Sequence, residues 1–196
     1  HQNFGPSQIR LQVVSDKIIR VQATAEQSFR NKQSLIIVPQ NSKANYKVEE
    51  QGDNLIITTA AMRAVMNEAT GQITFYDLKD NVLLNEVAQG GKTFKPFTVP
   101  DREIGVDIAK VPEAQKHGWS WRALFNSPDN EAFYGLGQHQ SEELNMKGKN
   151  EDLFQYNTKV SVPFVISNKN YGILWDSYSY CRWGNPEDYL QLNRAF

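Results

Sequence analysis

The stretch Ile9-Arg10-Leu11-Gln12-Val13 alternates apolar with polar residues, and Ile19-Arg20-Val21-Gln22-Ala23 shows the same alternation shortly after it. Successive side chains of an extended chain point to opposite faces, so a period of two places every second residue against a core and the others in solvent. Half-buried strands of this kind are typical of antiparallel sheets. The two stretches therefore predict a pair of antiparallel strands.

Further stretches have the length and composition of strands, and each is bounded by Gly, Pro, Asn or Asp. They are residues 34–38, 46–49, 54–59, 72–77, 82–85, 119–125, 160–167 and 171–175. Short strands that recur roughly every ten residues, with almost no helical apolar stripe, are typical of a β-sandwich and argue against alternating strands and helices. We therefore predict an all-β fold, an antiparallel β-sandwich.

Residues 60–69 could be read in two ways. They are rich in helix formers, and Gly71 after them could end a helix. However, Met62, Ala64 and Met66 alternate with the residues between them, and residues 68–71 could turn the chain into the next strand, so we predict a strand.

Prolines and charges interrupt the apolar pattern at 99–118, which predicts a long surface connection. Helical structure is expected only in a turn or two near residues 186–190.

The composition excludes several classes of protein. The 196 residues include 21 Lys+Arg against 22 Asp+Glu, and 40% are hydrophobic. This balance excludes a nucleic-acid footprint, a polybasic membrane anchor and a disordered chain. The longest apolar runs are far shorter than the roughly 20 residues that span a bilayer, so no membrane span is expected. Cys181 is the sole cysteine, which excludes an intrachain disulfide and a thiolate metal cluster.

Gly135-Leu136-Gly137 superficially resembles a dinucleotide-binding loop. The third glycine of that motif is replaced by Gln140, and no helix pattern follows. We therefore expect no nucleotide and no other cofactor. The glycines are interpreted instead as points where a strand bends or lets another backbone approach closely.

Histidines and acidic pairs offer no complete catalytic or metal-binding set. His1, His117 and His139 are far apart, and none has another histidine or a cysteine at metal-ligand spacing. His139 is expected in a loop, exposed to water or hydrogen-bonded locally, with contact to a sugar hydroxyl as its functional alternative. Adjacent carboxylates rarely flank a scissile bond, so the acidic pairs are interpreted as solvated loop charge. These pairs are residues 142–143, 151–152 and 187–188.

Several aromatic residues could contact a sugar. Trp119 and Trp121 lie two apart and so share one face of a strand, and Tyr178, Tyr180 and Trp183 cluster further on. Flat aromatic faces can stack on sugar rings. Aromatic residues two apart in a sandwich more often belong to the core, and we predict this role for the two tryptophans.

Several motifs follow one another in order along the chain, at residues 70–77, 83–86, 133–138, 144–148, 156–158, 162–164 and 171–176. Together they resemble the N-terminal β-sandwich of family 31 glycoside hydrolases, particularly the bacterial α-xylosidase and α-glucosidase type. The resemblance covers nearly the whole chain. It implies a galactose-mutarotase-like sandwich that packs against a (β/α)8 barrel.

The resemblance also implies a division of labour. In this family the barrel carries the aspartate nucleophile and the aspartate acid/base of a retaining α-glycosidase. Residues 1–196 are expected to form only the N-terminal domain, so we assign no catalytic residue and expect no activity from the chain alone. The absence of a starting methionine at His1 and the apolar end at Phe196 are expected for a chain cut from a longer protein, or for one whose signal was removed.

The same resemblance points to a substrate contact. The segment that matches Tyr156-Asn157-Thr158-Lys159 reaches the rim of the sugar pocket in this family, usually with an aspartate at the last position. We therefore predict Asn157, Thr158 and Lys159 as substrate-binding residues. A lysine can only donate hydrogen bonds, so the preferred sugar at this rim is left open. Gln138 likewise replaces a glutamate that is often seen after the family's Gly-x-Gly.

Two functions from different classes remain open at this stage. The first is an accessory domain that shapes a pocket for terminal α-linked xylose or glucose and packs on its own catalytic barrel. The alternative is a stand-alone carbohydrate-binding module with Trp119, Trp121 or Trp183 as stacking platforms. If a barrel partner exists, we expect an exposed apolar patch of more than a few hundred Å² on the chain. A periplasmic or extracellular location is expected.

Overall fold

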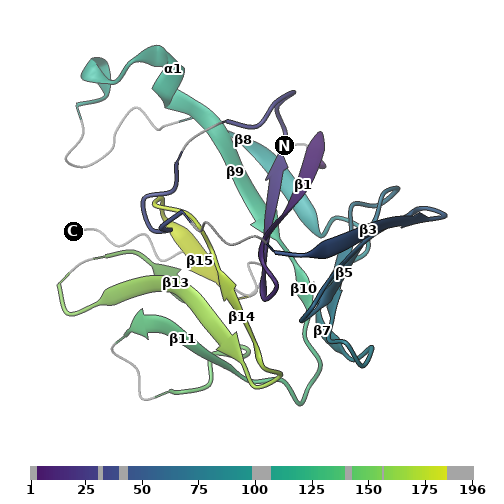
Figure 1. The fold of residues 1–196 in the computed structure, drawn as a ribbon. Coiled ribbons are helices and arrows are strands. Elements are labelled where there is room, and N and C mark those ends of the chain that lie inside the picture. Colours follow the sequence, from purple (N-terminus) through teal and green to yellow (C-terminus); the bar gives the residue numbers. More distant parts are fainter. Residues whose placement is uncertain are drawn as a thin grey trace. The chain divides into compact units, whose positions relative to one another are not determined.

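The structure, a computed structural model, describes residues 4–30, 33–39, 44–98, 107–139, 143–155 and 157–184 (Figure 1). The chain divides into two compact units. Unit 1 comprises residues 1–32 and 40–126, and unit 2 comprises residues 33–39 and 127–196. All strand pairs in both units are antiparallel, as the alternating sequence predicts.

Unit 1 begins with a two-stranded ribbon of β1 (Gln8–Ser15) and β2 (Ile18–Thr24). Leu11 lies opposite Val21, so the apolar residues of the two strands share one face of the ribbon. The register shifts between Val13 and Ser15, where a bulge precedes the turn. The strand pair that opens the sequence is therefore confirmed.

A six-stranded sheet forms most of unit 1, in the order β10-β7-β6-β5-β4-β3. Its strands are β3 (Tyr46–Gln51), β4 (Asn54–Thr59), β5 (Arg63–Asn67), β6 (Ile73–Tyr76), β7 (Val82–Glu86) and β10 (Phe125–Asn126). Ile57, Ala64 and Ile73 are buried on one face of this sheet. Neighbouring strands are consecutive in sequence from β3 to β7, so short turns set the register.

The segment 60–69 forms β5, which confirms the predicted strand against its helix propensity. Thr59 Oγ1 accepts hydrogen bonds from the backbone N–H groups of Ala61 (3.2 Å) and Met62 (3.0 Å), which turns the chain into β5. Gly71 has φ +70° and closes the following turn. Pairing with β4 and β6 outweighs the local preference for helix.

A long ribbon of β8 (Lys92–Thr98) and β9 (His117–Ala123) completes unit 1 (Figure 1). Phe4 extends this ribbon through two backbone hydrogen bonds with Phe94, of 2.8 and 2.7 Å. Within the predicted surface connection, η1 (Ile108–Lys110) and α1 (Glu113–Lys116) are single helical turns, so the expectation of helical structure only near residues 186–190 is wrong. Residues 99–106 and the expected helical turn near residues 186–190 lie outside the described residues.

Unit 2 is built around a three-stranded sheet in which β13 (Val160–Ser167) lies between β11 (Phe133–Gln138) and β14 (Tyr171–Leu174). A second pair consists of β12 (Glu151–Leu153) and β15 (Cys181–Trp183). The core contains Phe133, Leu136, Met146 and Val165, with Leu153, Tyr171, Ile173 and Trp183 packed against them.

The glycines of β11 have the role that their sequence predicts. Gly135 and Gly137 have φ values of +130° and +99°, and the register with β13 shifts between them. A Cβ at Gly137 would lie 2.0 Å from the backbone oxygen of Val160. The bend and the close approach of two backbones are therefore confirmed, and both require glycine.

The strand predicted at residues 34–38 is wrong. Ser34 Oγ accepts hydrogen bonds from the backbone N–H groups of Ile36 (3.2 Å) and Ile37 (3.0 Å), and it donates to Asp176 Oδ1 (2.8 Å). A serine that bonds its own backbone competes with sheet pairing and forms a bend instead. The apolar run at these positions is therefore largely exposed and not part of a sheet.

Candidate functional site

The predicted sugar-contacting residues lie in unit 2, on the turn that joins β12 to β13. Asn157 and Thr158 are exposed, whereas Lys159 is buried. Tyr156 lies outside the described residues. The structure thus separates the three predicted residues into an exposed pair and one buried cation.

Thr158 has a strained backbone, with φ +68°. A β-branched residue in the left-handed region is uncommon, and such a conformation costs on the order of 1–3 kcal/mol. Residues held in this way cluster at ligand-binding and catalytic sites. Thr158 lies on an exposed turn, and its Oγ1 donates a hydrogen bond to the backbone oxygen of Asn157 (2.5 Å).

Lys159 directs its ammonium into unit 2. Its Nζ pairs with the Glu151 carboxylate and donates to the backbone oxygen of Asp152. Gln155 ties the two sides of the turn together, because its Nε2 donates to the backbone oxygen of Lys159 (2.8 Å) and its Oε1 accepts from Ser161 N–H (3.1 Å). The turn that presents Asn157 and Thr158 is therefore fixed from inside by polar contacts.

His139 reinforces the same cluster. Its ring is buried, its Nε2 lies 2.6 Å from the backbone oxygen of Leu136, and its Nδ1 lies 3.0 Å from Glu151 Oε1. The predicted local hydrogen bond is confirmed, and the predicted alternative of water exposure is wrong for the side chain. A proton on Nε2 makes the bond to Leu136, whereas the contact with Glu151 lacks hydrogen-bond alignment.

The acidic pair at 151–152 is not solvated loop charge, which corrects that prediction. The Glu151 side chain is only 19% exposed and pairs with Lys159, while Asp152 accepts a hydrogen bond from the Tyr180 hydroxyl. Both acids lie on β12, which pairs with β15, and both are partly buried. Glu143 is solvated as expected and pairs with Lys149. Glu142 and the pair 187–188 lie outside the described residues.

The arrangement offers groups that can bind a polar ligand. Hydrolysis needs two carboxyl groups that flank the bond, one as acid and one as base or nucleophile. Among the described residues of the cluster, Glu151 is bound by Lys159 and Asp152 by Tyr180. The exposed amide of Asn157 and hydroxyl of Thr158 can exchange hydrogen bonds with a sugar. Among the residues that the structure describes, no group of three or more His, Cys, Asp or Glu could hold a metal ion.

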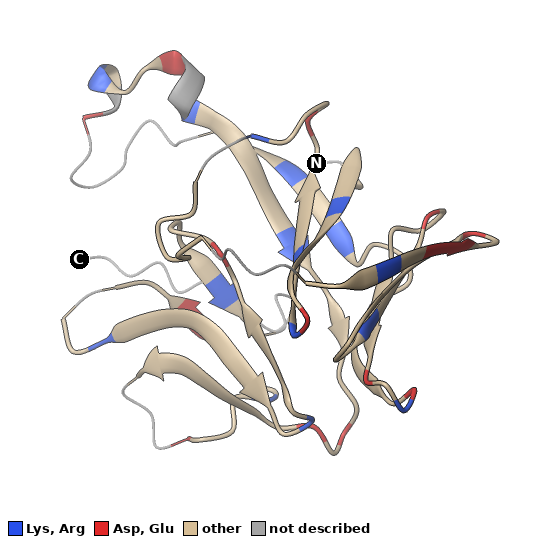
Figure 2. Ribbon diagram, in the orientation of Figure 1, with Lys and Arg blue, Asp and Glu red and all other residues tan. Residues whose placement is uncertain are grey.

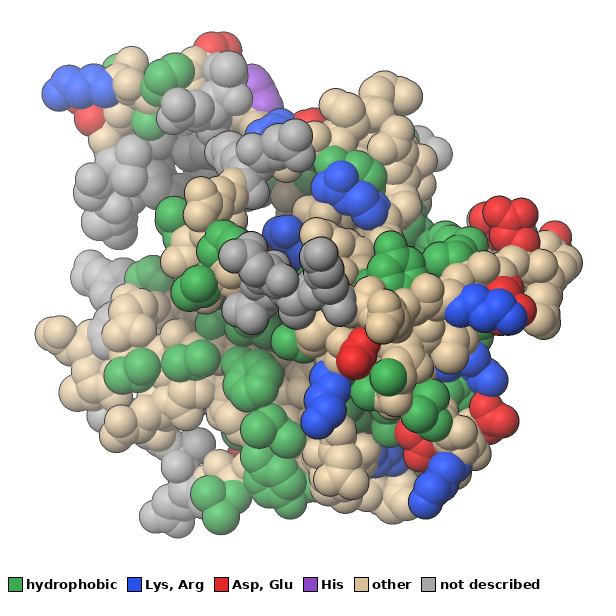
Figure 3. Space-filling model, viewed as in Figure 1, with side chains coloured by type: hydrophobic (Ala, Val, Ile, Leu, Met, Phe, Trp, Pro, Cys, Tyr) green, Lys and Arg blue, Asp and Glu red, His purple; other side chains and the backbone are tan. Residues whose placement is uncertain are grey.

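An apolar sheet face begins directly after this turn. Val160, Val162, Phe164 and Ile166 alternate along β13 and are 38–50% exposed. Tyr134 lies opposite Ile166 and Leu174 lies opposite Phe164, and both are also exposed, so the row continues onto β11 and β14. Figure 2 shows no charge along these three strands, and Figure 3 shows hydrophobic side chains gathered over them. We call these six residues the β13 face.

The aromatic predictions have mixed outcomes. Trp119 and Trp121 are 38% and 40% exposed, so the predicted core role is wrong, although both rings contact Phe94. Phe94 lies on β8 directly opposite Trp121 and is buried, whereas the two indoles stay partly exposed. Trp183 is a core residue instead, since it packs on Phe133 and donates from Nε1 to the backbone oxygen of Met146 (3.0 Å). Tyr178 and Tyr180 are exposed.

Comparison with known proteins identifies the domain. Residues 8–183 match the family model of the glycosyl hydrolase 31 N-terminal galactose mutarotase-like domain. The chain belongs to this family. The predicted fold class, an all-β, galactose-mutarotase-like antiparallel sandwich, and the predicted family are both confirmed.

The relatives of this glycosyl hydrolase 31 domain are much longer proteins. An α-xylosidase structure from Xanthomonas citri is 37% identical with a TM-score of 0.79, over 94% of this chain and 19% of that chain. An α-xylosidase from Saccharolobus solfataricus is 25% identical over 90% of this chain and 23% of its own length. A family 31 glucosidase from Pseudescherichia vulneris is 26% identical over 86% of this chain and 32% of its own length. The chain therefore spans about a fifth to a third of these relatives.

In the part of the chain that the structure describes, no helix has the length and apolar character to cross a bilayer.

Proposed function

We propose that the chain is the accessory N-terminal domain of a retaining α-glycosidase that acts on terminal α-linked xylose or glucose. The observation that carries this proposal is the family match over residues 8–183, together with the α-xylosidase and glucosidase names of much longer relatives. The chemistry belongs to a catalytic (β/α)8 barrel elsewhere in the full-length protein. The domain shapes the sugar pocket in carbohydrate degradation.

Within this function, Asn157 and Thr158 contact the sugar and Lys159 positions them. Exposure of the first two residues and the strained φ of Thr158 support direct contact. Burial of Lys159 against Glu151 supports a role in holding the turn. A sugar hydroxyl can both donate to and accept from the Asn157 amide, which suits a neutral ligand.

The β13 face is the docking surface for the barrel in this proposal. Soluble monomers seldom expose contiguous apolar patches larger than a few hundred Å², and larger patches mark interaction sites. Six large apolar side chains without an intervening charge on these strands support such a contact.

The rim is tested in the full-length protein with Asn157→Ala. Loss of a contact made to the bound sugar raises KM for a chromogenic α-xyloside or α-glucoside by about threefold to tenfold, equivalent to roughly 0.5–1.5 kcal/mol. Asn45→Ala is the matched control, because Asn45 is an exposed asparagine of unit 1. Equal kinetics for both variants and the parent would remove the rim contact from the proposal.

The second candidate is a stand-alone carbohydrate-binding module, which the surface positions of Trp119 and Trp121 favour. Calorimetric titration of the chain with xylose- and glucose-containing oligosaccharides separates the two. The module is supported if the chain binds these oligosaccharides, if the heat of binding is lost in Trp119→Ala, and if the complete gene product contains no barrel.

A periplasmic or extracellular location stays a prediction, and cell fractionation of the native source tests it.

A further inference from the structure

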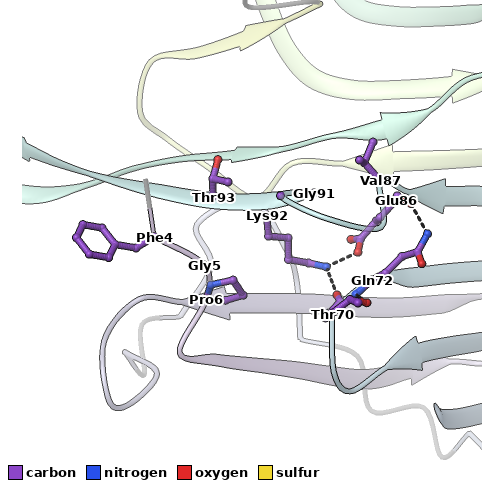
Figure 4. Close-up of a pocket in the computed structure, with 12 residues that line it drawn as sticks. Phe4, Gly5, Pro6, Thr70, Gln72, Glu86, Val87, Gly91, Lys92 and Thr93 are labelled. Atoms are coloured by element: carbon purple, nitrogen blue, oxygen red, sulfur yellow. Dashed lines mark hydrogen bonds and ion pairs between the residues drawn. The ribbon is translucent and has the colours of Figure 1, made fainter. Parts of the chain in front are cut away.

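A polar hollow in unit 1 lies outside the function proposed above (Figure 4). Its volume is about 270 Å³, and three segments line it: residues 4–6, 70–72 and 86–93. All of them belong to unit 1. The volume of the hollow lies just below the roughly 300–1,000 Å³ of pockets for drug-sized ligands and so suits a smaller molecule.

A buried ion pair forms one wall of the hollow. The side chains of Lys92 and Glu86 are 4% and 5% exposed, and Lys92 Nζ pairs with Glu86 Oε2. Lys92 Nζ also donates to the backbone oxygen of Gly71 (3.0 Å), and Glu86 Oε2 accepts from Ile73 N–H (2.8 Å). In Figure 4 the Lys92 side chain reaches across the hollow toward Glu86 and the turn before β6. These contacts fix both charged groups in place.

The same wall carries two acceptor atoms whose bonding is incomplete. Gln72 uses both donors of its Nε2, to Glu86 O (2.7 Å) and Asn85 Oδ1 (3.0 Å). No described residue donates to Gln72 Oε1, and none donates to Glu86 Oε1. Neither oxygen is among the fully buried atoms that lack a partner, so each is open to water or to a ligand in the hollow. Both residues line the hollow.

These groups define the chemistry of a ligand. Two acceptor oxygens require donors, and the Lys92 ammonium has three N–H groups, two of which are used within the chain. One Lys and one Glu leave the lining without net charge, so neither an anion nor a cation gains from the site. A hydroxyl group can donate to Glu86 or Gln72 and accept from Lys92. Several hydroxyls on one small, neutral scaffold meet all three needs.

We propose that this hollow binds a small neutral polyhydroxy compound, either a monosaccharide or the terminal sugar of a glycan. Glu86 Oε1 and Gln72 Oε1 accept from its hydroxyls, and Lys92 donates to it. The apolar wall at Pro6 and the glycine backbones at 90 and 91 pack against the carbon skeleton. The inference does not depend on the proposed glycosidase function, because no residue of the rim or of the β13 face contributes.

The test is a titration of the chain with xylose, with glucose and with an α-xylosyl disaccharide, followed by NMR of backbone amides. We expect dissociation constants of about 1–10 mM and shifts confined to residues 4–6, 70–72 and 86–93. Tighter binding of the disaccharide assigns the site to glycan ends, and equal binding assigns it to free monosaccharides. An absence of shifts in this set, with ordered water only in the hollow, would overturn the proposal.

A paired substitution keeps the test independent of folding. Gly5 lines the hollow, a Cβ on it would meet no atom within 4 Å, and its φ lies outside the left-handed region. Gly118 shares the last two properties but lies on β9, away from the hollow. Gly5→Phe should weaken binding at least about tenfold, while Gly118→Phe should leave it within about twofold. Equal affinities in the two variants would contradict the assignment.

Discussion

Lys159 and Glu151 form a largely buried ion pair beneath the turn that carries Asn157 and Thr158. The resemblance to family 31 enzymes leads one to expect an aspartate in place of this lysine, facing a sugar. Instead, the cation faces inward and neutralises a carboxylate that lies on β12. The pair supports the turn from inside, and it explains how a lysine fits where the resemblance predicts an aspartate.

Removal of the Lys159 charge should therefore destabilise unit 2. Loss of one partner from a buried ion pair leaves the other charge buried without a counterion. Because Glu151 retains some exposure, we expect Lys159→Met to lower the free energy of unfolding by about 2–3 kcal/mol. Lys149→Met is the control, since Lys149 forms an exposed pair with Glu143 and should cost at most about 1 kcal/mol. Urea unfolding measures both. Similar losses for the two variants would argue against a supporting pair.

Acid should weaken unit 2 through Glu131. Burial alone would raise the pKa of Glu131, but hydrogen bonds from Ser167 (2.6 Å), Tyr171 (2.6 Å) and Ser127 (3.0 Å) together outweigh it and lower the pKa below the usual value of 4.5. A lowered folded-state pKa gives stability that is complete above the unfolded value and is lost as pH falls through the folded value.

This linkage is measured as thermal stability between neutral pH and the acid range below 4.5. Tyr171→Phe removes one donor and should reduce the pH dependence, because the pKa of Glu131 then rises toward its usual value. Tyr134→Phe removes an exposed hydroxyl from β11 and should leave the pH dependence unchanged. An unchanged slope in Tyr171→Phe would exclude the hydroxyl as its source.

Unit 1 should depend on Lys92 more than on its neighbour Lys95. Lys92→Met leaves the Glu86 carboxylate buried without its cation, which costs about 3–5 kcal/mol. Lys95 is exposed on the same strand, and Lys95→Met should change stability by about 0.5 kcal/mol or less. Guanidinium unfolding, followed by the fluorescence of the tryptophans on β9, reports the difference. Comparable unfolding midpoints for the two variants would mean that the Lys92–Glu86 pair makes no net contribution to stability.

A charge placed on the β13 face should disturb docking on the barrel without disturbing the folding of the domain itself. Ile166→Lys replaces an exposed apolar residue, so the isolated chain should lose about 0.5 kcal/mol or less. In the full-length protein the same lysine would be buried against the barrel, and the activity and thermal stability should fall. Ile18→Lys, at an exposed position on β2, is the control. Full activity of the Ile166 variant would remove this face from the interface.

The sequence predicts local structure well where apolar and polar residues alternate with a single clear period. Alternation located β1, β2 and β13, and the glycine pair located the bend in β11. The prediction failed at residues 34–38, where Ser34 bonds its own backbone and apolar content alone does not reveal it. The ribbon strand β8 also escaped prediction, because Lys92 and Lys95 interrupt its apolar pattern.

The sequence singled out the residues of the candidate site but not the orientation of their side chains. The motif resemblance pointed to residues 157–159, yet the burial of Lys159 depends on Glu151, eight positions earlier on β12. His139 and Glu151 looked solvated because their mutual contact and the ion pair of Glu151 with Lys159 join residues from different segments of unit 2. The strained φ of Thr158 has no local sequence signal. Contacts between separate segments therefore decide which of the predicted residues are buried and which are exposed.

The central claim is that this domain supports catalysis without performing it. The most direct measurement compares hydrolysis of chromogenic α-xyloside and α-glucoside by the product of the complete gene with hydrolysis by the 196-residue chain. The account predicts turnover by the complete product and none by the chain at equal molar concentration. Turnover by the chain itself, or a complete gene product that contains no catalytic barrel, would contradict it.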